Sequence, residues 1–161
     1  MAMSSSSPEL VVPYKALPWS GRVGVYADAM LRAATGLILV PHGAQKLFGW
    51  FGGPGLEGAQ KMFESKLHLP PWLAIAAGVI EFFGGLLLAL GLATRLAGLL
   101  IAAQMFFTVF VVHWANGFFA MNGGFEYPLL WGVAALSFAL KGGGHCSIDN
   151  EIGKLTNHSP R

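Results

Sequence analysis

The longest stretch without a formal charge covers residues 96–125, and this stretch limits the fold more than any other feature of the sequence. A helix that is apolar on every side is either buried in a large protein or crosses a membrane. The chain has 161 residues, of which 54% are hydrophobic and 11% charged, whereas an average soluble domain carries about 25% charged residues. A soluble domain is therefore excluded, and so is a disordered chain, which needs few apolar residues and much charge. We expect an integral membrane protein in contact with the lipid bilayer.

Four apolar segments are long enough to form the helices of such a protein. We expect these helices at residues 26–48, 72–92, 96–114 and 127–140. The fourth has only 14 residues, or about 21 Å of helix, which is short against a hydrocarbon core of about 30 Å. Between the first two, apolar residues recur at helical spacing opposite charged ones, which favours a short helix on the membrane surface. The predicted fold is an all-α, four-helix membrane bundle with one interfacial helix between its first two spans.

The charges at the ends of these segments predict the domain limits and the orientation. Residues 1–21 are expected to form a flexible tail, residues 22–141 the membrane domain, and residues 142–161 a cytoplasmic C-terminal tail. Basic residues in short loops favour the cytoplasmic side. With four spans, the side that holds both termini carries seven basic residues and the other side three, so both termini are predicted to be cytoplasmic. The seven are Lys15, Arg22, Arg32, Arg95, Lys141, Lys154 and Arg161, and the three are Lys46, Lys61 and Lys66.

Several classes of function lack any support in the sequence. The formal net charge of +2 is too small and too scattered for nucleic-acid binding. Cys146 is the sole cysteine, so the chain has no internal disulfide and no CxxC redox pair. The histidines outside the spans are isolated, and no metal site or covalently bound cofactor is expected. Motifs for phosphate binding, metallopeptidases and serine hydrolases do not occur.

Ionisable residues within the expected spans are the main candidates for function, because each is costly in hydrocarbon unless it is paired or hydrated. In the first span, Asp28, Arg32, His42 and Lys46 fall within about 80° of one another on a helical wheel. Asp28 and Arg32 stand four residues apart, the spacing of a structural ion pair. The second span contains Glu81 near its middle.

Two glycines share the face of Glu81 and would let a neighbouring helix approach closely, namely Gly78 and Gly85. A contact of Glu81 with His42 or Lys46 across the first two helices is therefore expected. Two interpretations remain open at this point: Glu81 is part of a functional site, or it is a neutral or ion-paired residue that fixes the packing.

The third span adds polar residues on two different faces. Gln104 and Thr108 share one face, and His113 lies on another, about 140° from Thr108 if the helix is regular. Glu126 is placed at the mouth of the fourth helix. The topology therefore gathers His42, Lys46, His113 and Glu126 near one membrane surface, with Glu81 beneath them.

Several motifs together resemble the DoxX family of small membrane proteins. The first is the run from His42 through Gly43-Ala44-Gln45-Lys46-Leu47-Phe48-Gly49-Trp50-Phe51-Gly52-Gly53-Pro54-Gly55 to Leu56, and the second is Glu81-Phe82-Phe83-Gly84-Gly85-Leu86. Others are Leu90-Gly91-Leu92, Thr94-Arg95, His113 with Asn116-Gly117-Phe118-Phe119, and Glu126-Tyr127-Pro128. The similarity extends over about residues 31–149. It implies a four-helix protein of the bacterial or archaeal inner membrane.

The resemblance also implies a link to redox enzymes. Some members are similar to the membrane subunit of thiosulfate:quinone oxidoreductase, and others are thought to associate with redox-defence enzymes. The family's recurring polar positions match His42, Lys46, Glu81, His113 and Glu126 of this chain. A family likeness does not by itself establish a reaction.

The leading hypothesis is an inner-membrane subunit of an oxidoreductase system that binds quinone or quinol. Its catalytic residues would be His42 and Glu81, which could supply a hydrogen bond and a proton. Its other ligand-binding residues would be Lys46, His113, Glu126, Phe82 and Phe110. Electrons would come from another membrane or redox-enzyme subunit, and the chain could also form homo-oligomers.

Two alternatives belong to other classes of function. The chain could be a non-catalytic anchor or assembly subunit of a larger redox complex, in which the polar residues only set helix register. It could also hold a b-type haem between His42 and His113, because paired histidines on facing helices are the usual ligands of such a haem.

Overall fold

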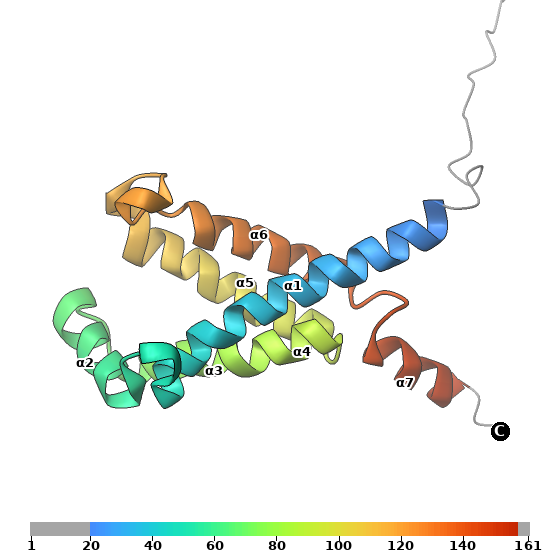
Figure 1. Ribbon diagram of the computed structural model, residues 1–161, viewed down its shortest axis with the longest axis horizontal. Coiled ribbons are helices and arrows are strands. Elements are labelled where there is room, and N and C mark those ends of the chain that lie inside the picture. The colour runs from blue at the N-terminus through green and yellow to red at the C-terminus, as the bar shows by residue number, and fades with distance from the viewer. Residues whose placement is uncertain (1–19, 158–161) are drawn as a thin grey trace, which may run out of the picture.

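A computed structural model describes residues 20–157 of the chain, and within this range every regular element is a helix and none is a strand (Figure 1). The expected N-terminal tail, residues 1–21, lies outside the described range except for its last two positions, which begin the first helix. The elements in order are α1 (Ser20–Phe48), η2 (Trp50–Gly52), α2 (Gly55–Leu67), α3 (Trp72–Val79), η3 (Ile80–Gly84), α4 (Gly85–Leu90), α5 (Thr94–Phe107), η4 (Thr108–His113), η5 (Trp114–Asn116), η6 (Ala120–Asn122), α6 (Glu126–Lys141) and α7 (Ile148–Asn157).

Three helical stretches in the described range are long and apolar enough to cross a membrane: Val23–Phe48, Trp72–Leu90 and Thr94–Asn116. The second and third join α-helical and π-helical segments into continuous rods. These are the first three spans predicted from the sequence, and the chain is a membrane protein. The expected fourth helix is present as α6, whose 16 residues correspond to about 24 Å.

Glycines bring α1 into backbone contact with the second rod. A Cβ atom at Gly36 would lie 2.7 Å from the backbone nitrogen of Ala89, and one at Gly43 would lie 2.7 Å from the carbonyl oxygen of Gly78. Gly85 faces Gly36 at the same interface. Such close approach is typical of membrane helices, which associate through packing of small residues. The predicted role of Gly78 and Gly85 is confirmed, and the helix that approaches them is α1.

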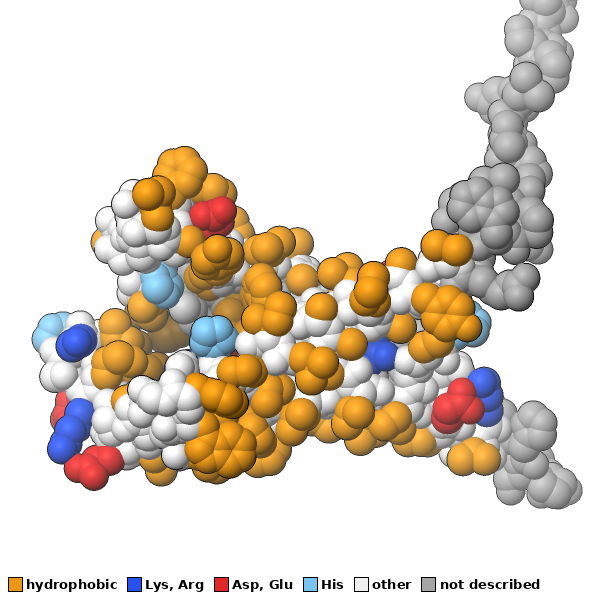
Figure 2. Space-filling view, viewed as in Figure 1, with side chains coloured by type: hydrophobic (Ala, Val, Ile, Leu, Met, Phe, Trp, Pro, Cys, Tyr) orange, Lys and Arg blue, Asp and Glu red, His pale blue; other side chains and the backbone are white. Residues whose placement is uncertain are grey.

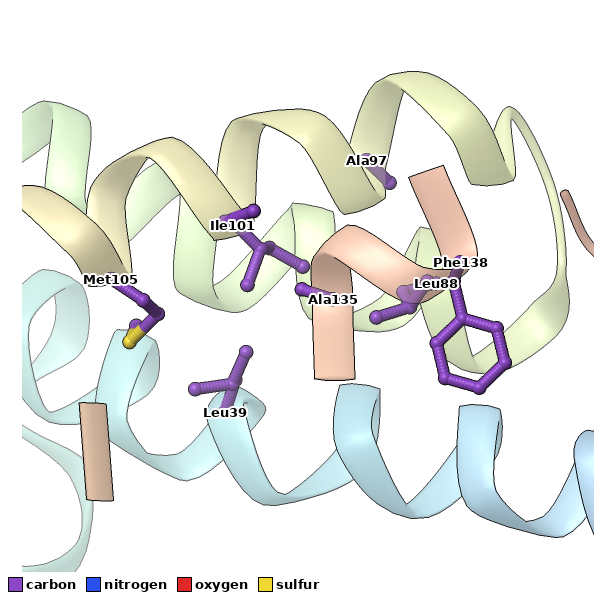
Figure 3. Close-up of a cluster of buried hydrophobic side chains, with 8 residues drawn as sticks. Leu39, Leu88, Ala97, Ile101, Met105, Ala135 and Phe138 are labelled. Carbon is purple, nitrogen blue, oxygen red and sulfur yellow. The ribbon is translucent and has the colours of Figure 1, made fainter. Parts of the chain in front are cut away.

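A compact apolar core fills the centre of the bundle, between α1, α4, α5 and α6. Figure 3 shows Ile101 across from Leu39 of α1, and Leu88 next to Ala135 and Phe138 of α6. The remaining buried members of this cluster are Ala97, Ala102 and Met105. Because these side chains come from four helices, the core fixes the helices relative to one another and leaves the polar residues to the ends of the bundle.

The start of α1 and the C-terminal helix α7 lie at one end of the bundle, and α2 and the loop before α6 lie at the other (Figure 1). We call these the terminal end and the loop end. At the terminal end, Lys141 of α6 forms an ion pair with Asp28 of α1 at 2.6 Å. The prediction of an ion pair between Asp28 and Arg32 is therefore wrong, because each of these residues binds a partner on another element.

Arg32 is almost completely buried and serves as a clamp for the chain at the terminal end. Its guanidinium donates hydrogen bonds to the carbonyl oxygens of Leu88 and Ala89, each at 2.7 Å, and of Cys146, at 2.6 Å. Leu88 and Ala89 lie in the last turn of α4, where carbonyl groups lack partners within the helix. Arg32 thus ties α1 and α4 to the segment that precedes α7.

Asp149 attaches α7 to the turn between α4 and α5. Its carboxylate accepts hydrogen bonds from the backbone N–H groups of Ala93, at 2.7 Å, and Thr94, at 2.9 Å. Burial raises the pKa of this carboxyl, but these hydrogen bonds and the charge of Arg32 outweigh burial and hold the pKa below its usual value. The segment expected to be a C-terminal tail therefore contains a helix that is attached to the bundle.

The helix expected between the first two spans is present as α2. Its residues Ala59 and Phe63 are buried against Ala74 of α3, whereas Glu57 and Lys61 form an exposed ion pair on another side. The amphipathic pattern predicted from the sequence is thus present at the loop end of the bundle.

Candidate functional site

A buried carboxylate lies at the centre of the polar residues. Glu81 is 6% exposed and accepts a hydrogen bond from Lys46 Nζ at 2.5 Å and another from Gln104 Nε2 at 2.9 Å. We call Lys46, Glu81 and Gln104 the polar cluster. It joins α1, η3 and α5, and the expected contact between the first two spans is formed by Lys46 rather than by His42.

Local backbone features explain why these side chains meet. Gly43 lets α1 touch the turn that carries Glu81, so Lys46, one helical turn further along, reaches the carboxylate. Glu81 itself lies in η3, a π-helical turn that interrupts the second span. Single π-helical turns within α-helices occur often at functional sites. The charged pair is thus held by a close helix contact and by an irregular turn.

Gln104 is a member of the cluster that the site prediction left out, although its position on the third span was noted. Its Oε1 atom is buried and has no hydrogen-bond partner among the described residues, while its own carbonyl oxygen accepts a hydrogen bond from Thr108 Oγ1 at 2.9 Å. An unpaired acceptor in a buried place is costly. The sequence did contain a signal for this residue, because Gln104 is a polar amide within the uncharged stretch 96–125.

The third span contains a second π-helical turn, η4, which runs from Thr108 to His113. In a regular α-helix these two residues would lie about 140° apart, as expected above. A π-helix forms hydrogen bonds between residues five apart, so its turn returns Thr108 and His113 to one side. Both side chains line the same cavity in the structure. The predicted separation of the two faces is therefore wrong at this end of the helix.

A hydrogen-bonded loop orients His113. Its Nδ1 atom lies 2.6 Å from the carbonyl oxygen of Gly123, which also accepts a hydrogen bond from Asn116 Nδ2 at 3.0 Å. Because a carbonyl group only accepts, Nδ1 carries the proton, and Nε2 of the neutral ring is left as an acceptor. Glu126 holds the same loop, since its Oε2 atom accepts a hydrogen bond from the backbone N–H of Ala120 at 3.0 Å.

A cavity of about 490 Å³ opens beside the polar cluster. Its lining is mostly apolar with a few converging polar groups, which is typical of small-molecule sites. Figure 2 shows a hollow in the surface at the loop end, with histidine side chains at its edges. The cavity is lined by Ile38, Leu39, His42, Lys46, Glu81, Met105, Thr108, His113, Tyr127, Pro128 and Trp131.

The other predicted site residues lie elsewhere. Phe82 packs edge-on against Phe48, with ring centres 5.2 Å apart, and Phe110 is 62% exposed and lies against Trp114. Neither lines the cavity, nor does Glu126. The expectation that Phe82 and Phe110 would flank a ligand ring here is wrong, because their rings are turned to other aromatic neighbours.

The aromatic side chains that line the cavity come from α6, namely Tyr127 and Trp131. Sequence reasoning missed both. His42 is an exposed residue at the edge, and no described residue forms a hydrogen bond with its imidazole. Within residues 20–157, no group of three or more His, Cys, Asp or Glu side chains is arranged to hold a metal ion. The arrangement combines a buried ion pair, two histidines with free ring nitrogens and two aromatic walls.

Comparisons with known proteins agree with the motifs. The DoxX family model matches residues 27–114, a range that includes His42, Lys46, Glu81 and His113. An uncharacterized protein of Haemophilus influenzae is 34% identical over 136 residues, which cover 80% of this chain and 92% of that protein. A Bacillus subtilis protein named "Putative oxidoreductase CatD" is 33% identical over 120 residues, which cover 74% and 82% of the two chains. No solved structure matches.

Proposed function

Since the chain belongs to the DoxX family, we propose that it is a small subunit of an oxidoreductase system in the bacterial inner membrane, and that the cavity binds the ring of a quinone or quinol. The observation that carries the proposal is the polar cluster at the wall of a largely apolar cavity of about 490 Å³. The name of the Bacillus subtilis relative is in line with redox chemistry.

The groups around the cavity suit the two states of such a ring. A quinone offers two carbonyl acceptors, and the ammonium of Lys46 and the imidazole of His42 are the donors available to them. A quinol offers two hydroxyl donors, and Nε2 of His113 is a matching acceptor. Tyr127 and Trp131 supply flat apolar surfaces for the ring.

Reduction of a quinone to a quinol takes up two electrons and two protons. The electrons come from a partner subunit, whereas the protons pass through groups of this chain. His42 is suited to this transfer because an imidazole can both accept and donate a proton. At the cavity wall, the Lys46 ammonium donates a hydrogen bond to the Glu81 carboxylate, so a proton can pass between these two groups and the ring. In this proposal His42 and Glu81 are the catalytic residues, and Lys46 and His113 bind the ring.

The proposal includes an arrangement in the membrane. Four helices cross the bilayer, with α6 as a short fourth span where the bilayer thins, and α2 lies on the membrane surface. The terminal end with Arg95 and Lys141 faces the cytoplasm, because basic residues favour that side. The cavity then lies in the outer half of the bundle, and the partner subunit or a second copy of the chain docks against the lipid-facing surface.

Binding of a water-soluble quinone without a tail tests the proposal directly. The purified full-length chain is placed in lipid nanodiscs, and its affinity for the quinone is measured by equilibrium dialysis. We expect at least a tenfold loss in Glu81→Gln and in His42→Ala. The matched controls are Glu57→Gln, which removes an exposed ion-paired carboxylate, and His68→Ala, which removes a histidine outside the cavity. Equal affinity in all five proteins contradicts the proposal.

The second candidate is a non-catalytic anchor, and one observation favours it: the polar cluster joins α1, η3 and α5 and so has a role in packing. If packing is its sole role, Glu81→Gln lowers thermal stability and leaves the turnover of the partner enzyme per assembled complex unchanged. The measurement is partner activity divided by the amount of complex isolated from the membrane.

The haem alternative rests on the two histidines that line the same cavity, His42 and His113. A carbonyl group that orients one ligand ring, as Gly123 does for His113, is a usual feature of metal-bound histidines. An absorbance spectrum of the purified protein decides this alternative, because a b-type haem gives strong bands in the visible range that disappear in His113→Ala.

A further inference from the structure

The cavity lies where α1 and α6 separate from each other. At the terminal end the two helices are joined by the Asp28–Lys141 ion pair, and in the centre of the bundle both contribute side chains to the apolar core. Toward the loop end they diverge, α1 toward α2 and α6 toward η6 (Figure 1). The side chains of both helices that line the cavity come from this diverging part. The opening between the helices therefore faces sideways.

Two side chains at the edges of this opening, one on each helix, are apolar and belong to helix surfaces that face lipid, while His42 is at another edge. Ile38 of α1 is 48% exposed and Tyr127 of α6 is 63% exposed, and both also line the cavity. Ile38 lies within the membrane-spanning stretch Val23–Phe48, about ten residues or 15 Å from its loop end. A lipid chain next to α1 thus has an apolar path to the cavity.

The polarity of the cavity changes from its opening to its back wall. The back wall holds the Lys46–Glu81 pair, whose side chains are 21% and 8% exposed. The exposed lining residues Ile38 and Tyr127 mark the opening, together with His42 at its edge. A molecule that fits this gradient has a polar ring, which reaches the ion pair, and an apolar tail, which leaves between the helices. A fully polar ligand would leave the opening unfilled.

We infer that the ligand reaches the cavity sideways from the bilayer between α1 and α6, and that its hydrocarbon tail remains in this opening, so the site selects quinones with a long isoprenoid tail. This inference rests on the proposed function, and it adds the route and the part of the ligand that determines specificity. Ile38 is then a residue that determines specificity, although its side chain is apolar and contacts only the tail of the ligand.

Substitution of Ile38 by tryptophan tests the route. The indole fills the opening and leaves the polar cluster in place. The probes are two quinones with the same ring, one without a tail and one with a tail of several isoprenoid units, each measured with the full-length chain in nanodiscs. We expect Ile38→Trp to weaken binding of the tailed quinone at least tenfold and to change binding of the tail-free quinone less than twofold. Leu37→Trp is the matched control, because Leu37 is 54% exposed on the same helix and does not line the cavity.

The pattern of results separates the two proposals. If wild-type protein binds neither quinone, the proposed function itself fails. If wild-type protein binds both and Ile38→Trp affects them equally or not at all, the lateral route is wrong and the quinone site stands. A tailed quinone with a photoreactive group midway along its tail gives independent evidence. Its cross-links, located by mass spectrometry, should fall on Ile38, Tyr127 or Pro128, and cross-links confined to the 117–125 loop overturn the inference.

Discussion

Close packing of α1 on the second rod is the structural condition for the polar cluster, and the substitution Gly43→Ala tests it. The new Cβ atom would lie 2.7 Å from the carbonyl oxygen of Gly78 and would also meet the backbone nitrogen and Cβ of Phe82, whereas ordinary contact begins at 3.4 Å. The first of these contacts alone requires α1 to move away by at least about 0.7 Å, since the atoms that it meets are mostly backbone and cannot rotate aside.

Such overpacking costs about 1–3 kcal/mol. At about 2–4 °C per kcal/mol for a chain of this size, the melting temperature should fall by roughly 2–12 °C. The movement also stretches the 2.5 Å contact between Lys46 and Glu81. We therefore expect weaker quinone binding in Gly43→Ala although no charged group is altered. Thermal unfolding in detergent, followed by tryptophan fluorescence, measures the melting temperature. Equilibrium dialysis measures the affinity for the quinone.

The matched control is Gly24→Ala, the same substitution on the same helix. A Cβ atom at Gly24 meets nothing within 4 Å, and alanine favours a helix over glycine by about 1 kcal/mol. This variant should be as stable as wild type or more stable. If Gly43→Ala melts at the same temperature as Gly24→Ala, the helices are not in backbone contact at Gly43 and the reasoning is wrong.

Three further predictions concern other parts of the molecule. Arg32→Met should remove the arginine donor from the carbonyl groups of Ala89 and Cys146, at about 1–3 kcal/mol each, whereas the carbonyl of Leu88 keeps the backbone N–H of Gly91 as a donor. Hydrogen exchange in α7 should become at least tenfold faster, and unchanged exchange would show that Arg32 does not hold this segment. The pKa of Asp149 is lower in the folded protein than its ordinary value near 4. The ionised carboxylate therefore stabilises the attachment of α7 above about pH 4, and this stabilisation is lost as the pH falls through the folded pKa. Limited proteolysis should accordingly release α7 below about pH 4. In Asp149→Asn the release should no longer depend on pH. Gln104→Leu should lower the melting temperature by roughly 2–8 °C, because Glu81 loses one of its two donors at a cost of about 1–2 kcal/mol, and an unchanged value contradicts the role of Gln104 in the cluster.

Patterns that depend on helical spacing were the part of the site that the sequence could predict. The contact of Lys46 with Glu81 and the close approach at Gly78 and Gly85 were predicted from helical spacing, and they are present although a π-helical turn interrupts the second span. The order of the first three spans follows from hydropathy alone. These predictions needed no knowledge of distant partners.

Local irregularity and distant partners account for the errors. The π-helical turn of η4 places Thr108 and His113 together, and no pattern of residue types marks such a turn in a single sequence. Arg32 donates a hydrogen bond to the carbonyl of Cys146, which is 114 residues away in the chain. The expected pair with Asp28 is therefore absent, because local spacing cannot reveal so distant a partner. Phe82 was predicted to bind the ligand, but neighbouring residues on a helix point in different directions, and its ring packs against Phe48 while Glu81 faces the cavity.

The central claim is that the Lys46–Glu81 pair and the two histidines surround one ligand ring. A structure of the full-length protein in nanodiscs with a tail-free quinone tests it most directly. The account predicts density for the ring between His42 and His113, with a carbonyl oxygen within hydrogen-bond distance of Lys46 Nζ or of a ring nitrogen of His42. An empty cavity at saturating quinone, or a ring bound elsewhere on the chain, would contradict the claim.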